Sequence, residues 1–476
     1  MVSKPQKEAA LAQIRDAGVV GAGGSGFPTH IKLQAKCDTV IVNGAECEPL
    51  LEKDLWLIER QTERLLDGLA RAAELVGARR QIVAVKAKRT ELLAKLQQAC
   101  HGRKNVDVVG LEDTYPAGDE VVLVYELTGR RVPPGGFPTD VGILVQNDET
   151  LVNLSFALDG EPVTHTWLTV CGAVPRPFTA RVPVGMATGE LLQWAGGFIS
   201  GGATTGSIRT WTKTGTKTET KTVTGTTHSA WIAMEGGAMM GRPVTDPAHP
   251  VSKTTAALLF LPRDHRVARF ATRSVPMQRA INRAACDQCS YCTQYCPRYL
   301  LGYAVEPHHV MRGVGFGAER HRDFDLYGRL CCECGICDLY ACPEDLSPRD
   351  ACRDTKTRMH DPKTVAGFLP DRGKIHSLRD GRLVPLTMLK KRLNLLVYDR
   401  PAPFRELDPL PDQVTVLHRQ HAGVTGKTQL QAGQIVMAGE QVSDVDAGEL
   451  GVPSHAPFAG TVQSVTENGT TIQRGM

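Results

Sequence analysis

Two cysteine-rich stretches decide the fold of this chain: CDQCSYCTQYCP at residues 286–297 and CCECGICDLYACP at residues 331–343. The first follows the spacing C-x2-C-x2-C-x3-C-P, and the second repeats it with one extra residue before the last cysteine. Three thiolates at this spacing lie on one tight loop and can bind three irons of a cubane cluster, whereas the fourth iron needs a ligand from elsewhere. Paired cysteines also bind zinc, but two full runs ending in Cys-Pro favour iron–sulfur chemistry. The sequence therefore predicts two 4Fe–4S clusters.

The ligands of the two clusters are predicted to be exchanged between the runs. In two-cluster ferredoxins of the bacterial type, the fourth cysteine of each run binds the other cluster. One predicted ligand set is Cys286, Cys289, Cys292 and Cys342, and the other is Cys331, Cys334, Cys337 and Cys296. Cys332 does not fit the x2 spacing and is interpreted as a bystander. The isolated cysteines are interpreted as small buried residues: Cys37, Cys47, Cys100, Cys171 and Cys352.

The composition limits the classes of protein that need to be considered. The chain has 476 residues, enough for about three or four domains, and a net charge of +4 with 5% aromatic residues. This balance does not favour nucleic acid as a partner. No apolar run reaches the roughly 18 residues of a membrane span, and the start lacks the apolar stretch of a secretory signal. We therefore expect a cytoplasmic protein, whose cysteines bind metal rather than form disulfides.

The N-terminal third predicts an α/β domain with a parallel sheet. A helix is expected at residues 7–17 and a glycine-rich loop, GVVGAGGSGFPTH, at residues 18–30. Further elements are expected as a strand at 38–44, a helix at 55–76, a strand at 81–86 and a helix at 91–100. Such a loop lets backbone N–H groups approach a phosphate. Because it follows a helix and not a strand, it does not match the G-x-G-x-x-G dinucleotide template, and a mere tight turn is the alternative.

Four segments resemble those of a flavoprotein superfamily. GAGGSGFPTHIK at 21–32 and VNGAECEP at 42–49 are followed by YPAGDE at 115–120 and VQNDET at 145–150. They are similar, in the same order, to the flavin-binding segments of the complex I flavoprotein subunit, of RnfC and of cobalamin reductases of the PduS type. The resemblance implies FMN bound by Gly21, Gly23, Gly24, Gly26, Lys32, Asn43, Glu46, Glu48, Glu120, Asn147 and Thr150. Only analogy points to Glu48 and Glu120 as candidates for the nicotinamide pocket.

The middle and the end of the chain predict small β domains. Residues 163–200 alternate between strands and turns and resemble an SLBB domain of the β-grasp type. The threonine-rich stretch 203–229 departs from this resemblance and is interpreted as a solvated low-complexity insert, with a partner-binding hairpin as the alternative. The segment SHAPFAGTV at 454–462 resembles the hairpin of a barrel-sandwich hybrid domain, without its carrier lysine. His455 could serve as an axial cobalt ligand, but a packing histidine is the favoured interpretation.

These patterns together predict a multidomain α/β fold with small β domains. We expect a Rossmann-like FMN- and NADH-binding α/β domain at 1–160, an SLBB-like β-grasp domain at 161–250, a two-cluster ferredoxin-like helical segment at 251–385 and a barrel-sandwich hybrid at 405–476.

The domain order indicates one branch of the superfamily. In RnfC the hybrid domain precedes the flavin domain, whereas in the PduS type it follows the ferredoxin segment, as it does here. The resemblance implies electron flow from NADH through FMN and two clusters to cobalamin, from Co(III) towards Co(II) and Co(I). It also implies a cob(I)alamin adenosyltransferase and microcompartment shell proteins as partners, and a place in the lumen of a propanediol-utilising microcompartment. The alternatives are an RnfC-like electron-input subunit of a membrane ferredoxin:NAD+ oxidoreductase and a non-enzymatic redox carrier associated with a shell.

Overall fold

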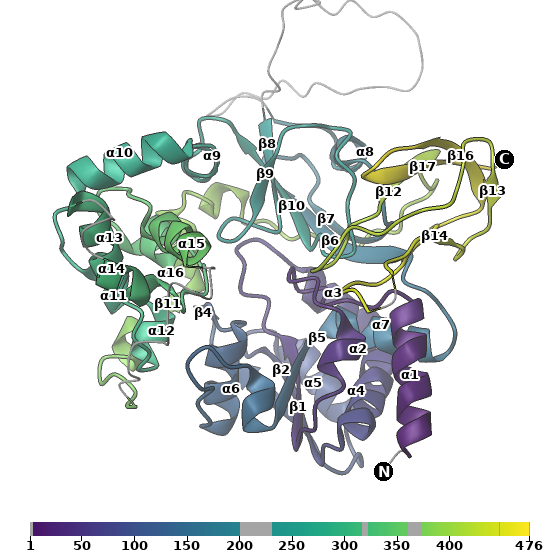
Figure 1. The fold of residues 1–476 in the computed structure, drawn as a ribbon, viewed down its shortest axis with the longest axis horizontal. Coiled ribbons are helices and arrows are strands. Elements are labelled where there is room, and N and C mark those ends of the chain that lie inside the picture. Colours follow the sequence, from purple (N-terminus) through teal and green to yellow (C-terminus); the bar gives the residue numbers. More distant parts are fainter. Residues whose placement is uncertain (1–2, 200–230, 317–321, 360–372, 447, 476) are drawn as a thin grey trace, which may run out of the picture.

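The computed structural model describes residues 3–199, 231–316, 322–359, 373–446 and 448–475. The threonine-rich stretch 203–229 lies outside these residues. Figure 1 shows a helical lobe beside two stacked parts, with an α/β domain below and a mixed β-sheet above, and the C-terminal strands beside that sheet. In the described residues, no helix has the length and apolar character that crossing a membrane requires.

The N-terminal domain contains a four-stranded parallel sheet in the order β3-β2-β1-β5. Its strands are β1 (Thr39–Gly44), β2 (Arg80–Lys86), β3 (Val106–Leu111) and β5 (Ile143–Asn147). Alternate side chains of β1 enter different cores, since Val40 and Val42 belong to one buried cluster and Ile41 to another. Helices α4 (Thr62–Val76) and α7 (Asp148–Leu158) contribute to the first cluster, and α6 (Glu120–Thr128) to the second. The predicted parallel α/β domain is confirmed.

The helices of this domain follow the expected positions with one difference. Helices α1 (Lys4–Asp16) and α5 (Thr90–Ala99) match the predictions, and the short helix α2 (Thr29–Lys32) follows the glycine loop. The helix expected at 55–76 consists instead of α3 (Lys53–Arg60) and α4. The break falls at Gln61, whose φ of −120° and ψ of 26° are not helical.

A mixed five-stranded sheet in the order β7-β6-β10-β8-β9 forms the second part. Its strands are β6 (His165–Gly172), β7 (Phe178–Pro183), β8 (Trp231–Glu235), β9 (Arg242–Val244) and β10 (Ala257–Pro262). Strand β10 pairs with β6 in parallel and with β8 in antiparallel orientation. Leu191 of helix α8 (Thr188–Trp194) packs in the same core as Leu168 and Phe260. The sheet therefore extends past residue 250, where we had expected this domain to end.

The helical lobe contains the two cysteine runs. Its described helices include α9 (Arg266–Ala271), α10 (Val275–Ala285), α11 (Tyr291–Gln294), α12 (Pro297–Leu300), α13 (Pro307–Phe316), α14 (Arg322–Asp325), α15 (Pro348–Arg358) and α16 (Leu386–Arg392). A two-stranded sheet joins the lobe to the N-terminal domain, because β11 (Val384–Pro385) pairs with β4 (Thr114–Tyr115). This pairing fixes the cysteine runs beside the loop that precedes α6.

The C-terminal part is a small β structure. It contains a sheet in the order β12-β17-β16-β13 and the pair β14-β15. The strands are β12 (Gln413–Leu417), β13 (Ile435–Val436), β14 (Gln441–Ser443), β15 (Ser454–His455), β16 (Gly460–Val465) and β17 (Gly469–Arg474). His455 is only 6% exposed and lies beside Lys253 and Gly18, which agrees with a packing histidine. The Ala422 amide donates to the Gly26 carbonyl over 2.9 Å, so this part also contacts the glycine loop.

Candidate functional site

The glycine loop between α1 and α2 forms a closed turn. The Gly26 amide donates to the Gly21 carbonyl over 3.0 Å, and the Gly21 amide donates to the Phe27 carbonyl over 2.9 Å. Gly24 and Gly26 have φ values of 100° and 63°, a region that suits glycine because other residues are strained there. A Cβ at Gly24 would meet no atom within 4 Å. The loop therefore leaves open space where a bulky group can approach its backbone.

A cavity of about 340 Å³ lies between the loop and the carboxyl ends of the strands. Most of the residues predicted to contact FMN line it: Gly21, Gly23, Lys32, Asn43, Glu46, Glu48, Glu120 and Asn147. Three predicted residues do not. Thr150 accepts a 3.0 Å hydrogen bond from the Ala22 amide and so supports the loop from behind. Gly26 faces His421 and Ala422 of the C-terminal part, and Gly24 lies at the open side of the loop.

Lys32 and Glu120 form an ion pair at one side of the cavity. Their Nζ and Oε1 atoms are 2.9 Å apart, and Lys32 also donates to the Val145 carbonyl over 2.8 Å. Asn43 donates to the Gly118 carbonyl over 2.9 Å, which ties the end of β1 to the loop before α6. These side chains are held by the carboxyl ends of parallel strands, the usual place for ligands in such folds. The arrangement fits the phosphate of flavin mononucleotide, because the open backbone of the glycine loop and the Lys32 side chain line the same cavity.

Two acidic residues of the VNGAECEP segment differ in their partners. Glu46 accepts from the Asp54 amide over 2.8 Å, and burial together with the Asp54 carboxylate raises the pKa of Glu46 to about 8. Glu48 accepts from the Met239 and Met240 amides over 3.0 and 2.9 Å, while burial raises the pKa of Glu48 to about 7. Glu48 therefore holds the turn between β8 and β9 against the flavin domain. Sequence reasoning missed this role.

Lys53 also lines the cavity, and the sequence did not single it out. The side chain is 3% exposed, and its Nζ lies 2.9 Å from Glu149 Oε2 and 3.6 Å from Asp54 Oδ1. Although burial works in the opposite direction, the Glu149 and Asp54 carboxylates hold the pKa of Lys53 above its ordinary value. Lys53 is therefore a charged ammonium at the cavity wall. In the sequence, a lysine at the start of a helix gave no sign of burial.

The structure brings the first predicted ligand set together. Burial and, to a lesser degree, the neighbouring Cys286, Cys289 and Cys342 raise the pKa of Cys292 to about 12. Cys342 comes from the second run, so the chain crosses between the runs as expected. The Leu346 amide points at Cys342 Sγ over 3.4 Å and Gln288 Nε2 at Cys286 Sγ over 3.2 Å. Such N–H donors to sulfur are typical of iron–sulfur sites, where they tune the potential.

The second predicted ligand set also gathers in one place. Cys334 lies near Cys337 and Cys296, and Cys337 lies near Cys331 and Cys296 and also near Cys292 of the first set. The first run thus contributes Cys296 to the second group. Eight thiols in two groups of four fit two cubane clusters, since each cubane needs four thiolates.

Two further cysteines lie within this second group. Cys332 lies next to Cys334, and Cys352 lies next to Cys331. The Glu333 amide donates to Cys331 Sγ over 3.3 Å. Cys332 is therefore next to the predicted ligands, and Cys352, although buried as expected, is not isolated from them. The sequence could not show this, because Cys352 belongs to α15 and reaches the group only through folding.

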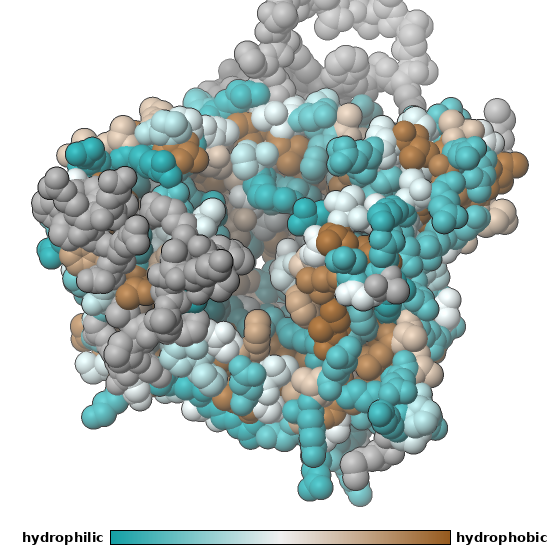
Figure 2. Space-filling view, viewed as in Figure 1, coloured by the Kyte–Doolittle hydropathy of each residue, from teal (hydrophilic) through white to brown (hydrophobic). Residues whose placement is uncertain are grey.

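The cavity and the second cysteine group are in direct contact. Cys332 and Cys334 line the same cavity as the glycine loop. Tyr115, which is 2% exposed, donates through its hydroxyl to the Cys334 carbonyl over 2.7 Å. Figure 2 shows this face of the molecule hollowed between the helical lobe and the neighbouring parts. A flavin in the cavity would thus lie beside the predicted ligands of one cluster.

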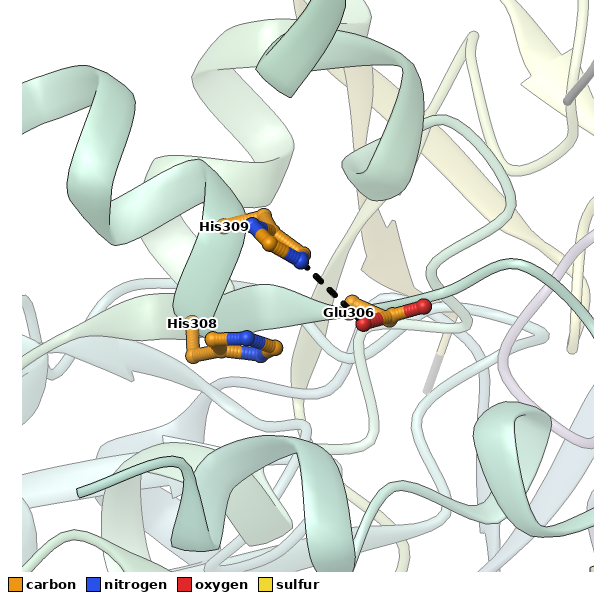
Figure 3. Close-up of side chains that lie close together, drawn as sticks. All are labelled: Glu306, His308 and His309. Carbon is orange, nitrogen blue, oxygen red and sulfur yellow. Dashed lines mark ion pairs between the residues drawn. The ribbon is translucent and has the colours of Figure 1, made fainter. Parts of the chain in front are cut away.

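A further set of possible ligands lies at the start of α13 (Figure 3). Ligand atoms of Glu306, His308 and His309 lie within 4.8 Å of one another. His309 Nε2 is 3.4 Å from Glu306 Oε2, and the His309 ring stacks on Tyr327 at 4.5 Å. His308 Nδ1 is hydrogen-bonded to Thr293 Oγ1 over 2.7 Å. These contacts account for the positions of the three side chains, so we assign them to the packing of α13 against α11.

Comparison with known proteins agrees with this site. Residues 14–155 match the family model of the Nuo51 FMN-binding domain, and residues 285–347 match that of the 4Fe-4S dicluster domain. The chain is thus a flavin and iron–sulfur electron-transfer oxidoreductase.

Its relatives define the family more closely. The chain is 36% identical to the cobalamin reductase PduS of Citrobacter freundii, over 97% of this chain and 96% of that protein. The identity to PduS of Salmonella typhimurium is also 36%, with the same two coverages. The chain belongs to the PduS family.

More distant likenesses cover less of the chain. The C subunit of the Na(+)-translocating ferredoxin:NAD(+) oxidoreductase complex of Acetobacterium woodii is 31% identical over 62% of this chain and 58% of that protein. An NAD+-reducing [NiFe]-hydrogenase in the H2-reduced state aligns with a TM-score of 0.45 and 21% identity, over 75% of this chain and 61% of that one.

Proposed function

We propose that this chain is an NADH-dependent cobalamin reductase that takes cob(III)alamin to cob(II)alamin and towards cob(I)alamin. The observation that carries the proposal is the contact between the flavin cavity and the second cysteine group through Tyr115 and Cys334. The names of the PduS relatives support the choice of acceptor. Bound FMN would supply the conversion between a two-electron hydride and one-electron steps.

The residues of the chain have distinct parts in this proposal. The amides of the glycine loop and Lys32 hold the flavin phosphate, and Asn43 and Glu46 line its ring system. The ligand set of Cys331, Cys334, Cys337 and Cys296 is placed first in the electron path, because Cys334 of this set lines the flavin cavity, whereas, among the described residues, no cysteine of the other set does. The set of Cys286, Cys289, Cys292 and Cys342 follows. Glu48 and Tyr115 position the two halves of the path relative to each other.

Finer assignments in this proposal rest on the family resemblance. They are the SLBB identity of the mixed sheet, the barrel-sandwich hybrid identity of the C-terminal strands, and the exact number of two clusters. They also include transfer of the product to a cob(I)alamin adenosyltransferase, contact with shell proteins, and a place in the cytoplasm within the lumen of a microcompartment.

The test is an anaerobic assay with defined components. The protein is reconstituted with iron, sulfide and FMN, NADH is added, and the loss of cob(III)alamin absorbance is followed. One NADH gives up a hydride, so it reduces two cob(III)alamin to cob(II)alamin and releases one proton. We expect activity in the wild type and a strong loss in Cys289→Ala. Equal corrinoid reduction without flavin or clusters would contradict the electron path.

An electron-input subunit of the RnfC kind is the second candidate function. The likeness to the corresponding subunit of a Na(+)-translocating complex supports it, although it covers about three fifths of the chain. A protein that reduces cobalamin without any membrane partner argues against this candidate. If NADH does not reduce the bound flavin, the protein would instead be a redox carrier.

A further inference from the structure

A second and larger cavity lies in the helical lobe, beside the cysteine groups. Its volume is about 950 Å³, and it is bounded by α10, α15 and the turn that leads into β9. Phe270, Ala271, Val314 and Ala351 give it an apolar floor, and Phe270 is only 3% exposed. Cavities of about 300–1,000 Å³ with apolar walls and a few polar groups are typical of sites for small organic ligands. The flavin does not need this space, because the glycine loop lines the other cavity.

Residues of the cavity floor pack against the cysteines. Val314 and Ala351 line the cavity and pack in the same apolar group as Cys286, Cys331 and Cys342. Glu333, also in the wall, donates its amide to Cys331 Sγ. A ligand on this floor would lie next to members of both predicted ligand sets. The cavity is therefore placed where electrons can leave the clusters.

The wall of the cavity is basic. Three carboxylates and six arginines line it. The arginines are Arg242, Arg273, Arg279, Arg283, Arg349 and Arg353. Four of the six are paired with carboxylates: Arg242 with Glu235 over 3.2 Å, Arg279 with Asp354 over 2.6 Å, Arg349 with Asp338 over 3.3 Å and Arg353 with Glu333 over 2.9 Å. Arg279 and Arg283 are one turn apart on α10, so they present two guanidinium groups on one side. Guanidinium groups bind phosphate oxygens in a planar, bidentate way.

We propose that this cavity binds the corrinoid that accepts the electrons. A corrinoid is a large macrocycle with apolar faces, amide arms and one phosphodiester. Its macrocycle would lie on the Phe270 and Ala351 floor, and Arg279 and Arg283 would bind the phosphodiester. A cluster held by the adjacent cysteines would supply the single electron that reduces Co(III) to Co(II). This inference rests on the proposed function and adds to it the site of the acceptor.

The experiment measures binding separately from turnover. Aquacobalamin is dialysed to equilibrium against the reconstituted full-length protein and quantified by its visible absorbance. The variant is Arg279→Glu/Arg283→Glu, and the matched control is Arg103→Glu, an exposed arginine paired with Glu63 far from both cavities. Because two charge-assisted contacts become repulsive, we expect the dissociation constant to rise at least about tenfold in the double variant. The control should bind like the wild type, and the KM for NADH with ferricyanide as acceptor should stay the same in the double variant.

Any other outcome contradicts the inference, and each one indicates a different alternative. Unchanged aquacobalamin binding in the double variant means that the corrinoid binds elsewhere. A raised KM for NADH with unchanged aquacobalamin binding means that the cavity takes the dinucleotide. If the double variant loses binding only to an added protein partner, such as an adenosyltransferase, the two arginines belong to a protein-docking surface instead. If wild-type protein neither binds nor reduces aquacobalamin while NADH still reduces its flavin, the proposed function itself is wrong, a result distinct from the first three.

Discussion

The Tyr115 hydroxyl donates a 2.7 Å hydrogen bond to the carbonyl oxygen of Cys334. The two residues are 219 positions apart in sequence, yet Tyr115 belongs to the loop before α6 and Cys334 to the second cysteine run. Both line the flavin cavity. This bond therefore joins the wall of the flavin site to the second cysteine run, together with the pairing of β11 and β4.

Tyr115→Phe should slow electron transfer out of the flavin without changing flavin reduction by NADH. The variant loses one buried hydrogen bond, which costs about 1 kcal/mol, and lets the Cys334 loop shift. Stopped-flow absorbance separates flavin reduction by NADH from electron transfer out of the flavin. We expect the rate of the second step to fall several-fold. Tyr398→Phe is the control, because Tyr398 is half-buried and lies outside the cavity and both cysteine runs. Equal internal transfer rates in Tyr115→Phe and wild type would show that the bond has no such role.

Gly23→Val should weaken FMN binding. A Cβ at Gly23 would already lie 3.4 Å from the Cβ of Asn147, so the branched side chain of valine would occupy the space where the flavin approaches the loop. We expect the FMN dissociation constant to rise about tenfold or more, measured by the recovery of flavin fluorescence on dilution. Gly381→Ala, at a glycine with open space around it, should bind FMN like the wild type. An unchanged FMN affinity in Gly23→Val would remove the glycine loop from the site.

Glu149→Gln should destabilise the flavin domain. Glu149 is 1% exposed, pairs with Lys53 over 2.9 Å and accepts from the Trp167 amide over 3.0 Å. Removing one partner of a buried ion pair leaves the other charge uncompensated, at a cost of about 3–5 kcal/mol. We expect a clear fall of the melting temperature in thermal unfolding. The double variant Lys53→Met/Glu149→Gln should recover part of it, whereas Glu63→Gln, at a surface pair with Arg103, should change stability by less than about 1 kcal/mol.

The sequence predicted local features well and distant contacts poorly. The parallel strands and the helix α5 appear where apolar patterning placed them, and the spacing of the cysteines led to two crossed groups. In contrast, the roles of Glu48 and Lys53 depend on partners about 190 and 96 positions away. Nothing in their own neighbourhood shows that Met239 and Met240 supply amides to Glu48. Cys352 likewise joins the second cysteine group only because α15 packs against it.

Cys331 and Cys332 offer two adjacent thiols for one ligand position. The x2 spacing favours Cys331, and the Glu333 amide donates to its sulfur over 3.3 Å, as N–H groups do to cluster thiolates. We therefore expect Cys331→Ser to lose one cluster, so that iron falls from about eight to about four per protein. Cys332→Ser should keep both clusters. The measurements are iron and sulfide content together with the EPR signals of the dithionite-reduced protein. Loss of a cluster in Cys332→Ser, with both retained in Cys331→Ser, would reverse the ligand assignment and place Cys332, at the wall of the flavin cavity, on the cluster itself.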